Sequence, residues 1–487
     1  MEFEPVIGLE VHAELQTRSK MFCSCPVVDN TLSDSNSAVC PVCSGMPGVL
    51  PVVNEQAVEY GMKVALALNC KIANTSIFER KNYFYPDLPK GFQISQYEQP
   101  LAVNGFLYIQ TSLGEKKIRI NRVHLEEDTG KLTHISEEEN YSLVDLNRAG
   151  VPLLEIVTEP DMHTVEEVHA YATGLRMIIR YLGVNSGDME KGVMRFEANV
   201  SVKKVNTEKL GTRVEIKNLN SFRAMERAIE YEVQRQIAVL ESGGRVHQET
   251  LGWNEDLGET YSQRSKEEAH DYRYFPEPDL PPLIVTQDWI ERVESSLPEL
   301  PYQRLRRYQQ DFYLSPVNAM RLIDDQNVAD YFEQCAAVDE QISPLKIANW
   351  IATELFTWMR QSKAPISEIR VSPEEMVALL KFIENKSINL NTAKKVFAEM
   401  LKSGKSADTI IKSKGMGQIS DLNAIEEMVN KVLNDHPGEL QAYKAGKETL
   451  ENWFFGQVMR SAKGQANPSL VKAELGRQLL SRMKKTG

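Results

Sequence analysis

Three segments of this chain alternate between apolar and polar residues, and they constrain the fold more than any other feature. They are residues 6–15, 195–202 and 212–218. Because the side chains of a β-strand point alternately to its two faces, each segment predicts a strand with one face on a core. The other face carries acidic, basic or imidazole side chains. We therefore expect a sheet with one buried face and one face of mixed charge, which suits a site that handles anions and a metal together.

The first of these strands carries Glu10, His12 and Glu14 on its polar face. Neighbouring side chains on one face of a strand lie about 6.7 Å apart, so two of them can reach one shared ion. A half-buried edge strand with a solvated charged face would show the same pattern. Taken alone, this stretch favours the solvated strand, and a metal site needs further acidic residues nearby.

Two other parts of the sequence supply acidic residues. Glu126, Glu127 and Asp128 follow a hairpin expected at residues 101–125, and three adjacent carboxylates repel one another unless a cation relieves the repulsion. Glu155 lies inside the apolar run LLEIV, where a carboxylate costs desolvation free energy unless it meets a partner. From these residues alone, a buried ion pair and a metal ligand explain Glu155 equally well.

Four of the six cysteines are close together, in the pattern C-S-C-x14-C-P-V-C. Two close pairs separated by a loop are typical of a structural zinc ribbon. The first residues, MEFEPVIGLE, lack the basic and apolar regions of a secretory signal, so we expect a cytoplasmic protein in which disulfides are disfavoured. The sequence thus predicts a zinc ribbon at residues 23–43, with free thiols as the alternative. Its ligands would be Cys23, Cys25, Cys40 and Cys43.

The segment 78–96, FERKNYFYPDLPKGFQISQ, has no helical or strand period and predicts a long irregular loop. Long loops of this composition are often functional. Lys81 and Lys90 could hold phosphates there, and aromatic side chains such as Tyr83 offer a surface on which a base can stack. A packed surface loop with solvated lysines is the alternative.

The second part of the chain differs from the first. The first part mixes helices with short strands, whereas from about residue 299 only helical patterns follow, so we expect an α+β fold followed by all-α regions. Residues 404–417 predict a linker before the last seventy-odd residues. No run of eighteen apolar residues exists, so nothing is expected to span a membrane.

The charge of the chain is uneven. The net charge of −12 argues against a protein that coats nucleic acid non-specifically. Residues 411–487, however, hold twelve basic and eight acidic residues, a balance of +4, so the preceding residues carry −16. A module that grips nucleic acid at one end and a solvated helical face both fit this balance.

Common catalytic motifs are absent. The sequence contains no GxxxxGK[ST], no strand-linked GxGxxG, no GxSxG and no HExxH. Standard nucleotide loops and hydrolase elbows are therefore excluded, and the function has to come from a less common site.

Longer motifs run from one end of the chain to the other. They are GLEVHAELQT, FERKNYFYPDLPKGFQISQ, HLEED, VDLNRAGVPLLEIVTEPD, EIKNLNSF and DYRYFPEPDL, followed by KGMGQISD and FFGQVMRSAKGQANP near the C-terminus. In these motifs the chain resembles the B subunit of the heterotrimeric aspartyl-/glutamyl-tRNA amidotransferase, over essentially its whole length.

The resemblance implies an organisation and a function. It implies a cradle-like catalytic domain with a largely antiparallel sheet at residues 1–297, a helical domain at 298–410 and a tRNA-binding tail at 411–487. It implies an ATP-dependent carbon–nitrogen ligase that phosphorylates the side-chain carboxylate of Glu-tRNA(Gln) or Asp-tRNA(Asn). Ammonia from the amidase, or A, subunit would then displace the phosphate, and a small C subunit would complete the heterotrimer. A non-catalytic tRNA-binding scaffold is the competing function.

The resemblance also implies roles for individual residues. The Mg²⁺ ligands would be Glu10, His12, Glu127 and Glu155. The catalytic residues that handle phosphate would be Lys81, Lys90 and Arg148, and ATP would bind at Lys81, Tyr83 and Lys90. Glu14 is left as a structural residue. Many relatives have Cys-Asp in place of Phe196-Glu197, which keeps the carboxylate but changes its reach. Zinc would be structural and not required by the reaction.

Overall fold

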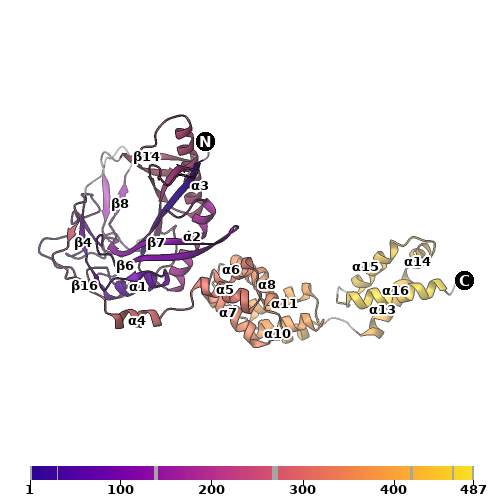
Figure 1. Cartoon of the computed structure of the whole chain (residues 1–487). Helices are drawn as coiled ribbons and strands as arrows, with labels where there is room; N and C mark the ends of the chain where they lie inside the picture. Colours follow the sequence, from indigo (N-terminus) through magenta and orange to yellow (C-terminus); the bar gives the residue numbers. More distant parts are fainter. Residues whose placement is uncertain are drawn as a thin grey trace. The chain divides into compact units, whose positions relative to one another are not determined.

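The computed structural model of the 487-residue chain describes residues 3–29, 31–135, 141–265, 272–416, 421–462 and 465–484. The chain divides into two compact units, Met1–Arg304 and Leu305–Gly487 (Figure 1). The first unit combines a large, mostly antiparallel sheet with helices, and the second is helical. The predicted fold class, α+β followed by all-α regions, is confirmed.

A nine-stranded sheet forms the centre of the first unit, in the order β14-β13-β12-β11-β1-β10-β7-β6-β2. Neighbouring strands are antiparallel except β12 and β13, which are parallel. The strands are β1 (Phe3–Glu14), β2 (Lys71–Ile72), β6 (Ala102–Thr111), β7 (Gly114–Glu127), β10 (Pro152–Thr158), β11 (Met194–Lys204), β12 (Val214–Leu219), β13 (Glu249–Asn254) and β14 (Glu259–Ser265). The three strands predicted from alternation, β1, β11 and β12, are neighbours in this sheet.

Helices cover the apolar face of the sheet. They are α1 (Glu55–Ala67), α2 (Val165–Tyr181) and α3 (Phe222–Glu241), and they pack on β7, β6 and β11 respectively. Each begins at a residue whose side chain accepts a backbone N–H of the first turn, namely Asn54, Thr164 and Ser221. Burying large apolar side chains on this face stabilises the sheet by about 1.5–3 kcal/mol per side chain. The opposite face is left to polar residues.

The sequence predicted one long irregular loop at residues 78–96, and this prediction is wrong for both ends of the segment. Its ends form the hairpin strands β4 (Glu79–Asn82) and β5 (Phe92–Ser95), and β15 (Phe275–Pro276) adds a third strand. Because β15 comes from a distant part of the sequence, no local sequence pattern predicts this three-stranded sheet. Its first residue, Glu79, is buried and accepts the backbone N–H groups of Tyr97 and Glu98.

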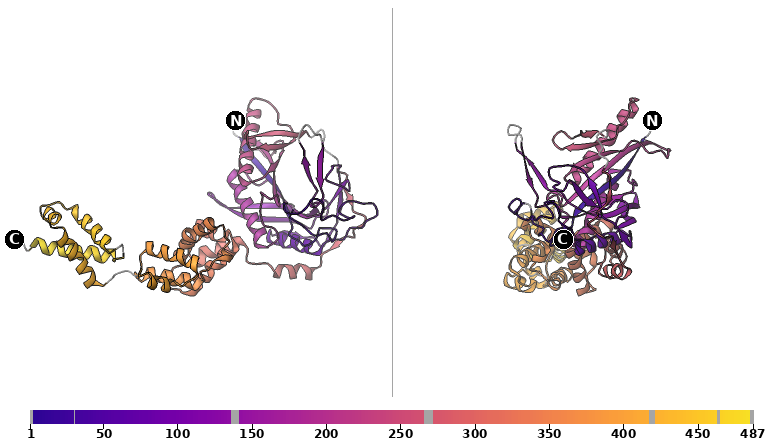
Figure 2. Two further views of the ribbon diagram at one scale, coloured as in Figure 1. Left: turned by 180° about the vertical axis from the view of Figure 1, so that it is seen from behind. Right: turned by 90° about the vertical axis from the view of Figure 1, so that its left-hand side faces the viewer.

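Two small sheets and one further helix complete the first unit. The strands β3 (Thr75–Ser76) and β16 (Leu283–Ile284) pair with each other, as do β8 (Lys131–His134) and β9 (Ser142–Asp145). The ribbon of β8 and β9 extends away from the large sheet (Figure 2). The helix α4 (Gln287–Ser295) packs on α1.

The second unit contains two separate hydrophobic cores. One is built from residues between Leu305 and Ile411, and the other from residues between Ile425 and Leu479. The helices are α5 (Pro301–Asp311, which starts in the first unit), α6 (Pro316–Ile323), α7 (Gln326–Val338), α8 (Pro344–Trp350), the π-helix η2 (Ile351–Leu355), α9 (Phe356–Ser362), the 3₁₀-helix η3 (Ile366–Glu368), α10 (Pro373–Glu384), α11 (Leu390–Ser403), α12 (Ala407–Ser413), α13 (Leu422–Asp435), α14 (Pro437–Lys444), α15 (Leu450–Ser461) and α16 (Pro468–Lys484).

The linker predicted at residues 404–417 is wrong for much of its length. Residues 407–413 form α12, which packs on α10 and α11 and buries Ala407, Ile410 and Ile411. The helix was not predicted because most of its residues are small, polar or charged. Only three of its seven residues are buried in the core, which leaves a weak helical pattern in the sequence. The last residue of the predicted linker, Gly417, lies outside the described residues.

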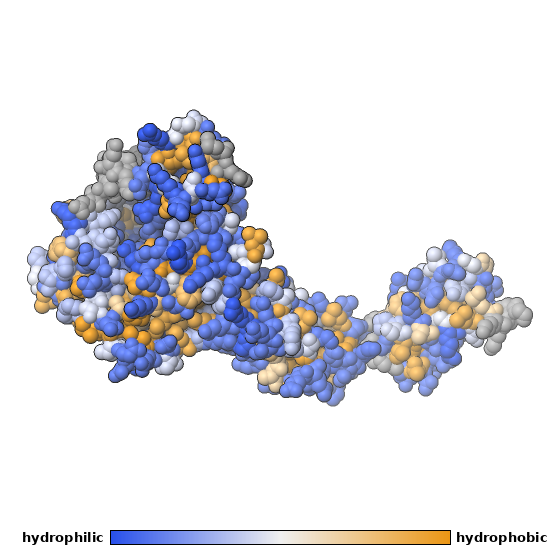
Figure 3. All heavy atoms as spheres, in the orientation of Figure 1, coloured by the Kyte–Doolittle hydropathy of each residue, from blue (hydrophilic) through white to orange (hydrophobic). Residues whose placement is uncertain are grey.

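The surface is mixed in character. On the face shown in Figure 3, apolar residues are interspersed with hydrophilic ones over both units. Among the described residues, no helix is both long enough and apolar enough to cross a membrane.

Candidate functional site

The polar face of the large sheet gathers acidic residues from five neighbouring strands. On β1, Glu10 lies opposite Glu197 of β11, and His12 lies opposite Glu155 of β10. Glu155 in turn lies opposite His124 of β7. Antiparallel pairing brings directly opposite side chains on one face to within about 5 Å of each other. The alternation that predicted the strands thus lines up a row of charged groups across the sheet.

The first group of this row consists of His12, Glu126 and Glu155. The Nε2 atom of His12 lies 3.4 Å from Oε2 of Glu155 and 3.7 Å from Oε1 of Glu126. One ligand atom from each residue lies within 4.8 Å of the others. Both carboxylates are buried, with exposed fractions of 6% for Glu155 and 2% for Glu126. We call these three residues the histidine cluster.

A second group, Glu10, Glu197 and Glu215, lies beside it and has the same close spacing of ligand atoms. We call it the glutamate cluster. Asn199 donates its Nδ2–H to Oε1 of Glu10 at 2.8 Å. The Nζ atom of Lys217 lies 2.8 Å from Oε2 of Glu197 and 3.5 Å from Oε1 of Glu215. One lysine therefore offsets part of the charge of three carboxylates.

The pKa values of both clusters reflect this excess of negative charge. Burial, reinforced by the Glu155 and Glu197 carboxylates, raises the pKa of Glu10. Burial disfavours the charged ring of His12, but its contact with Glu155 and the nearby Glu197 outweigh burial and raise its pKa to about 9. Although burial opposes it, the two neighbouring imidazoles lower the pKa of Glu155 well below its usual range. The His12 ring therefore keeps its proton and offsets part of the negative charge of the neighbouring carboxylates.

These residues fit a divalent cation. Mg²⁺ prefers carboxylate oxygens and commonly uses one or two of them together with phosphate oxygens and water. Each cluster offers at least two carboxylates, and a cation would neutralise the charge that otherwise holds a proton on His12. The imidazole is a softer ligand than Mg²⁺ prefers, and Mn²⁺ accepts it more readily. Of the four predicted ligands, the structure places His12 and Glu155 in the histidine cluster and Glu10 in the neighbouring glutamate cluster.

A cavity of about 1020 Å³ opens over this face of the sheet. Besides His12, Glu155 and the whole glutamate cluster, it is lined by cationic side chains, including Lys81, Arg122 and Lys217, and by tyrosines. The rings of Tyr97 and Tyr274 stack with centroids 4.4 Å apart, and the Lys81 ammonium lies 5.1 Å from the ring centroid of Tyr272. The cavity therefore combines acidic clusters, cations for phosphates and aromatic surfaces for a base.

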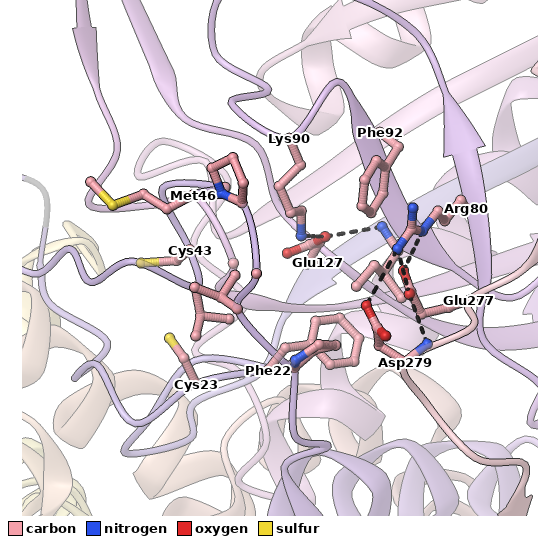
Figure 4. Close-up of a pocket in the computed structure, with 18 residues that line it drawn as sticks. Phe22, Cys23, Cys43, Met46, Arg80, Lys90, Phe92, Glu127, Glu277 and Asp279 are labelled. Atoms are coloured by element: carbon pink, nitrogen blue, oxygen red, sulfur yellow. Dashed lines mark hydrogen bonds and ion pairs between the residues drawn. The ribbon is translucent and has the colours of Figure 1, made fainter.

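Glu127, the fourth predicted metal ligand, lies elsewhere. It follows Glu126 directly on β7, so its side chain leaves the opposite side of the strand. There it forms an ion pair with Lys90 and accepts the backbone N–H of Ile94. Figure 4 shows Lys90 and Glu127 pointing toward each other in a smaller cavity of about 200 Å³. The structure places Glu126, and not Glu127, with His12 and Glu155.

The other predicted phosphate-binding residues divide between these two places. Lys81 lines the large cavity, whereas Lys90 lines the small one. The Arg148 guanidinium donates to the backbone carbonyls of Thr129 and Gly130, at 3.0 and 2.8 Å. Tyr83 packs edge-on against Tyr272, a cavity residue, with ring centroids 6.0 Å apart. Of the predicted set, Lys81 is the residue that contacts the large cavity directly.

Sequence reasoning missed several residues of the site, among them Glu126, Glu215 and Lys217. Part of the signal for each was present. Val123 and Leu125 are apolar and are fully buried in the structure, so Glu126 has the parity of the polar face and Glu127 that of the opposite face. Glu215 and Lys217 have the polar parity of a predicted strand, but the order of the strands that makes them neighbours of Glu197 could not be read from the sequence.

The four predicted zinc ligands converge. The Sγ atom of Cys43 lies 3.9 Å from that of Cys40 and 4.0 Å from that of Cys25, and all four sulfur atoms lie within 4.8 Å of one another. Four thiolates at about 2.3 Å from a tetrahedral zinc ion would be about 3.8 Å apart. The cysteines are therefore close to the arrangement that zinc requires, and a four-sulfur donor set is the one that zinc favours.

Comparison with known proteins identifies the family of this chain. A family profile described as "GatB/GatE catalytic domain" matches residues 5–291, and a second, described as "GatB domain", matches residues 330–479. The chain belongs to the GatB/GatE family. The resemblance seen in its motifs is thus confirmed over nearly the whole length.

Individual relatives cover the chain almost completely. The chain is 49% identical over 471 residues to a protein of Thermodesulfovibrio yellowstonii, which covers 97% of this chain and 98% of that protein. It is 49% identical over 479 residues to a protein of Thermoanaerobacter pseudethanolicus, and the match covers 98% of this chain and 100% of that protein. It is 47% identical over 474 residues to one of Thermotoga maritima, with 97% and 98% covered. Each of these relatives is the B subunit of an aspartyl/glutamyl-tRNA(Asn/Gln) amidotransferase.

Proposed function

We propose that this chain is the B subunit of a glutamine-dependent tRNA amidotransferase, and that its large cavity activates the amino acid on misacylated tRNA with ATP. Family membership and the names of the relatives support the reaction class. The observation that carries the catalytic assignment is that acidic residues of both clusters line one cavity together with Lys81, Arg122 and Lys217. A scaffold that only binds tRNA has no need of buried carboxylates gathered in this way.

The reaction runs in two steps. First, a side-chain carboxylate oxygen of Glu-tRNA(Gln) or Asp-tRNA(Asn) attacks the γ-phosphorus of ATP, and the bond to the β-γ bridging oxygen breaks, which gives an acyl phosphate and ADP. Ammonia then attacks the carbonyl carbon, the C–O bond to phosphate breaks, and one proton leaves with the phosphate. Phosphorylation is needed because ammonia cannot displace oxide from a carboxylate.

The cavity residues address the main obstacle, which is the approach of two anions. Lys81 remains a cation despite its burial, because Glu126 and Glu155 raise its pKa. It and Arg122 can therefore hold phosphate oxygens, while the tyrosine surfaces offer a place for a base. The two clusters would hold Mg²⁺ through Glu10, Glu155, Glu126 and their neighbours. When bound, Mg²⁺ neutralises phosphate charge that grows during transfer.

The position of Glu126 changes the assignment of ligands. We assign to Glu126 the role that the resemblance implied for Glu127, because Glu126 reaches His12. We also assign Glu197 and Glu215 to the metal site together with Glu10. Lys90 and Arg148 are then residues that hold the surrounding structure, and the zinc centre is structural.

The partners follow from the reaction. This chain supplies activation, so ammonia has to come from an amidase subunit, and a small third subunit would complete the complex. The basic balance of residues 411–487 supports a role of the C-terminal helices in holding tRNA. Removing residues 421–487, which leaves α12 in its core, should raise the KM for tRNA about tenfold and leave the KM for ATP unchanged. Equal effects on both would contradict this role.

The direct test is ATP turnover and amide formation by the assembled complex, with Glu-tRNA(Gln) and Asp-tRNA(Asn) supplied separately. Glu10→Gln should lower both rates about 1000-fold, since it removes a carboxylate ligand of the proposed metal site. Glu208→Gln, in an exposed loop after β11, is the matched control and should leave both rates unchanged. If Glu10→Gln leaves ATP turnover and amide formation intact, the catalytic assignment fails and the scaffold function is favoured.

A further inference from the structure

A lysine is completely buried next to the four cysteines. Lys20 has an exposed fraction of 0% and is among the largest fully buried side chains of the described chain. Its Nζ atom lies 3.5 Å from Sγ of Cys43 and 3.2 Å from the backbone carbonyl oxygen of Leu146. Neither residue carries a carboxylate. Among the residues that the structure describes, no acidic side chain forms an ion pair with Lys20.

A buried ammonium without a carboxylate partner is costly. Lysine is almost never fully buried unless its charge is paired, because the interior cannot replace the hydration of the ammonium. One carbonyl oxygen and one neutral thiol would compensate only part of that cost. Glu127, whose Oε2 would lie 3.8 Å from a Cβ added at the neighbouring Gly150, is already paired with Lys90. The sulfur of Cys43 is therefore the group in contact with the Lys20 ammonium that can carry the compensating negative charge.

The cysteine cluster can supply this charge when it binds a metal ion. Four thiolates on one Zn²⁺ carry a net charge of −2, which is itself unfavourable in a buried site. The sulfur of Cys43 also accepts the backbone N–H of Cys40 at 3.2 Å, so two N–H donors converge on this one sulfur. Two donors on one sulfur are expected for a thiolate and are poorly matched to a protonated thiol.

We infer that Lys20 is the counter-charge of the four-cysteine centre, and that it binds the Cys43 thiolate while it fastens the metal-loaded centre to the loop before β10. The ammonium and the metal centre compensate each other's buried charge. The ammonium reduces the net charge of the centre to −1, and the centre gives the ammonium an anionic partner, which no carboxylate among the described residues supplies through an ion pair.

The second contact of Lys20 gives the pairing a structural consequence. The ammonium of Lys20 donates to the carbonyl oxygen of Leu146. Its aliphatic stem lies close to Gly150, where an added Cβ would be 3.5 Å from Lys20 Cδ and 3.4 Å from Cys43 Cβ. The next residue, Met21, donates its backbone N–H to the Gly150 carbonyl oxygen at 2.7 Å. These contacts lie just before β10, the strand that carries Glu155. Lys20 is thus a positioning residue, which acts through the loop.

The test compares zinc release from the full-length chain and from variants, with a coloured zinc chelator in excess. Lys20→Met keeps the length of the side chain and removes its charge, so it should release zinc at least tenfold faster, the size typical of residues that support metal ligands. Lys20→Arg, which keeps the charge, should stay closer to the wild-type rate than Lys20→Met. Lys131→Met, at an exposed position of β8, is the control and should release zinc at the wild-type rate. Equal release rates for Lys20→Met and the control would overturn the inference.

A second measurement separates the charge from simple packing. Thermal unfolding is recorded for zinc-loaded and chelator-stripped protein. Lys20→Met should lower the Tm of the loaded protein but not that of the stripped protein, in which the buried ammonium has lost its partner. An equal loss of Tm in both states would show a packing role and overturn the inference. If Lys20→Met does not fold, Lys20→Gln gives the same comparison of release rates, and release at the wild-type rate would again overturn it.

Discussion

Glu126 and Glu127 are neighbours in sequence, both are buried, and yet they meet opposite surroundings. Glu126 lies beside His12 and His124, both of which line the large cavity, and it shares this surrounding with the Glu155 carboxylate. Glu127 faces the other side of the strand, where Lys90 pairs with it directly and the Ile94 N–H satisfies it. The first environment has an excess of negative charge and the second is balanced.

This difference separates a binding site from a structural ion pair. A balanced buried pair has no remaining affinity for an added ion, because its charges are already compensated. The cavity face, by contrast, holds His12 in its charged form up to about pH 9, the pKa to which its carboxylate neighbours raise it. Local charge balance, and not the residue type, is what distinguishes the two carboxylates.

The largest expected effect comes from removing each charge in turn. Glu126→Gln should lower kcat/KM for amide formation about 1000-fold in the assembled complex, because it withdraws a charge from the proposed metal site. Glu127→Gln should lower it less than about tenfold. Steady-state kinetics at saturating Mg²⁺ measure both. The opposite order of effects would return the metal role to Glu127.

The two lysines test the same contrast from the cationic side. Lys81→Met should reduce the rate of ATP-dependent activation about 100-fold, since Lys81 faces the cavity where phosphates would bind. Lys90→Met should change the rate per folded molecule only a few-fold, because its ammonium is engaged with Glu127. Single-turnover measurements with labelled ATP give both values. Comparable losses would place Lys90 in the reaction after all.

The third test concerns stability and not the rate of the reaction. Lys90→Met leaves Glu127 buried without its partner and should destabilise the first unit by about 3 kcal/mol. The double variant with Glu127→Gln should recover part of this loss, with a coupling of about 1–3 kcal/mol between the two sites. Denaturant unfolding of the single and double variants measures the coupling. Additive losses would mean that the pair does not interact, and the contrast between the two faces would weaken.

The sequence anticipated the site better than the structure around it. Strand alternation placed Glu10 and His12 on a polar face, and the apolar run singled out Glu155, but the family resemblance was needed to name them as metal ligands. Choosing Glu126 over Glu127 required the alternation of buried and polar side chains along Val123 and Leu125. That alternation does not continue regularly through the whole of β7, because the pairing of β7 with β10 shifts register near Arg122. Glu215 could not be placed next to Glu10 without the strand order. The β4–β5 hairpin was missed because its third strand, β15, comes from residues 275–276.

The central place of β1 in the large sheet bears on how the protein is made. β1 leaves the ribosome first, but its two neighbours are β10 and β11, which end at Thr158 and Lys204. At about 5–20 residues per second, the strand waits roughly ten to forty seconds for both partners. During that time its apolar side and both of its hydrogen-bonding edges are unprotected, which favours aggregation. Chaperone protection of the nascent chain until residue 204 has been made would therefore limit this aggregation.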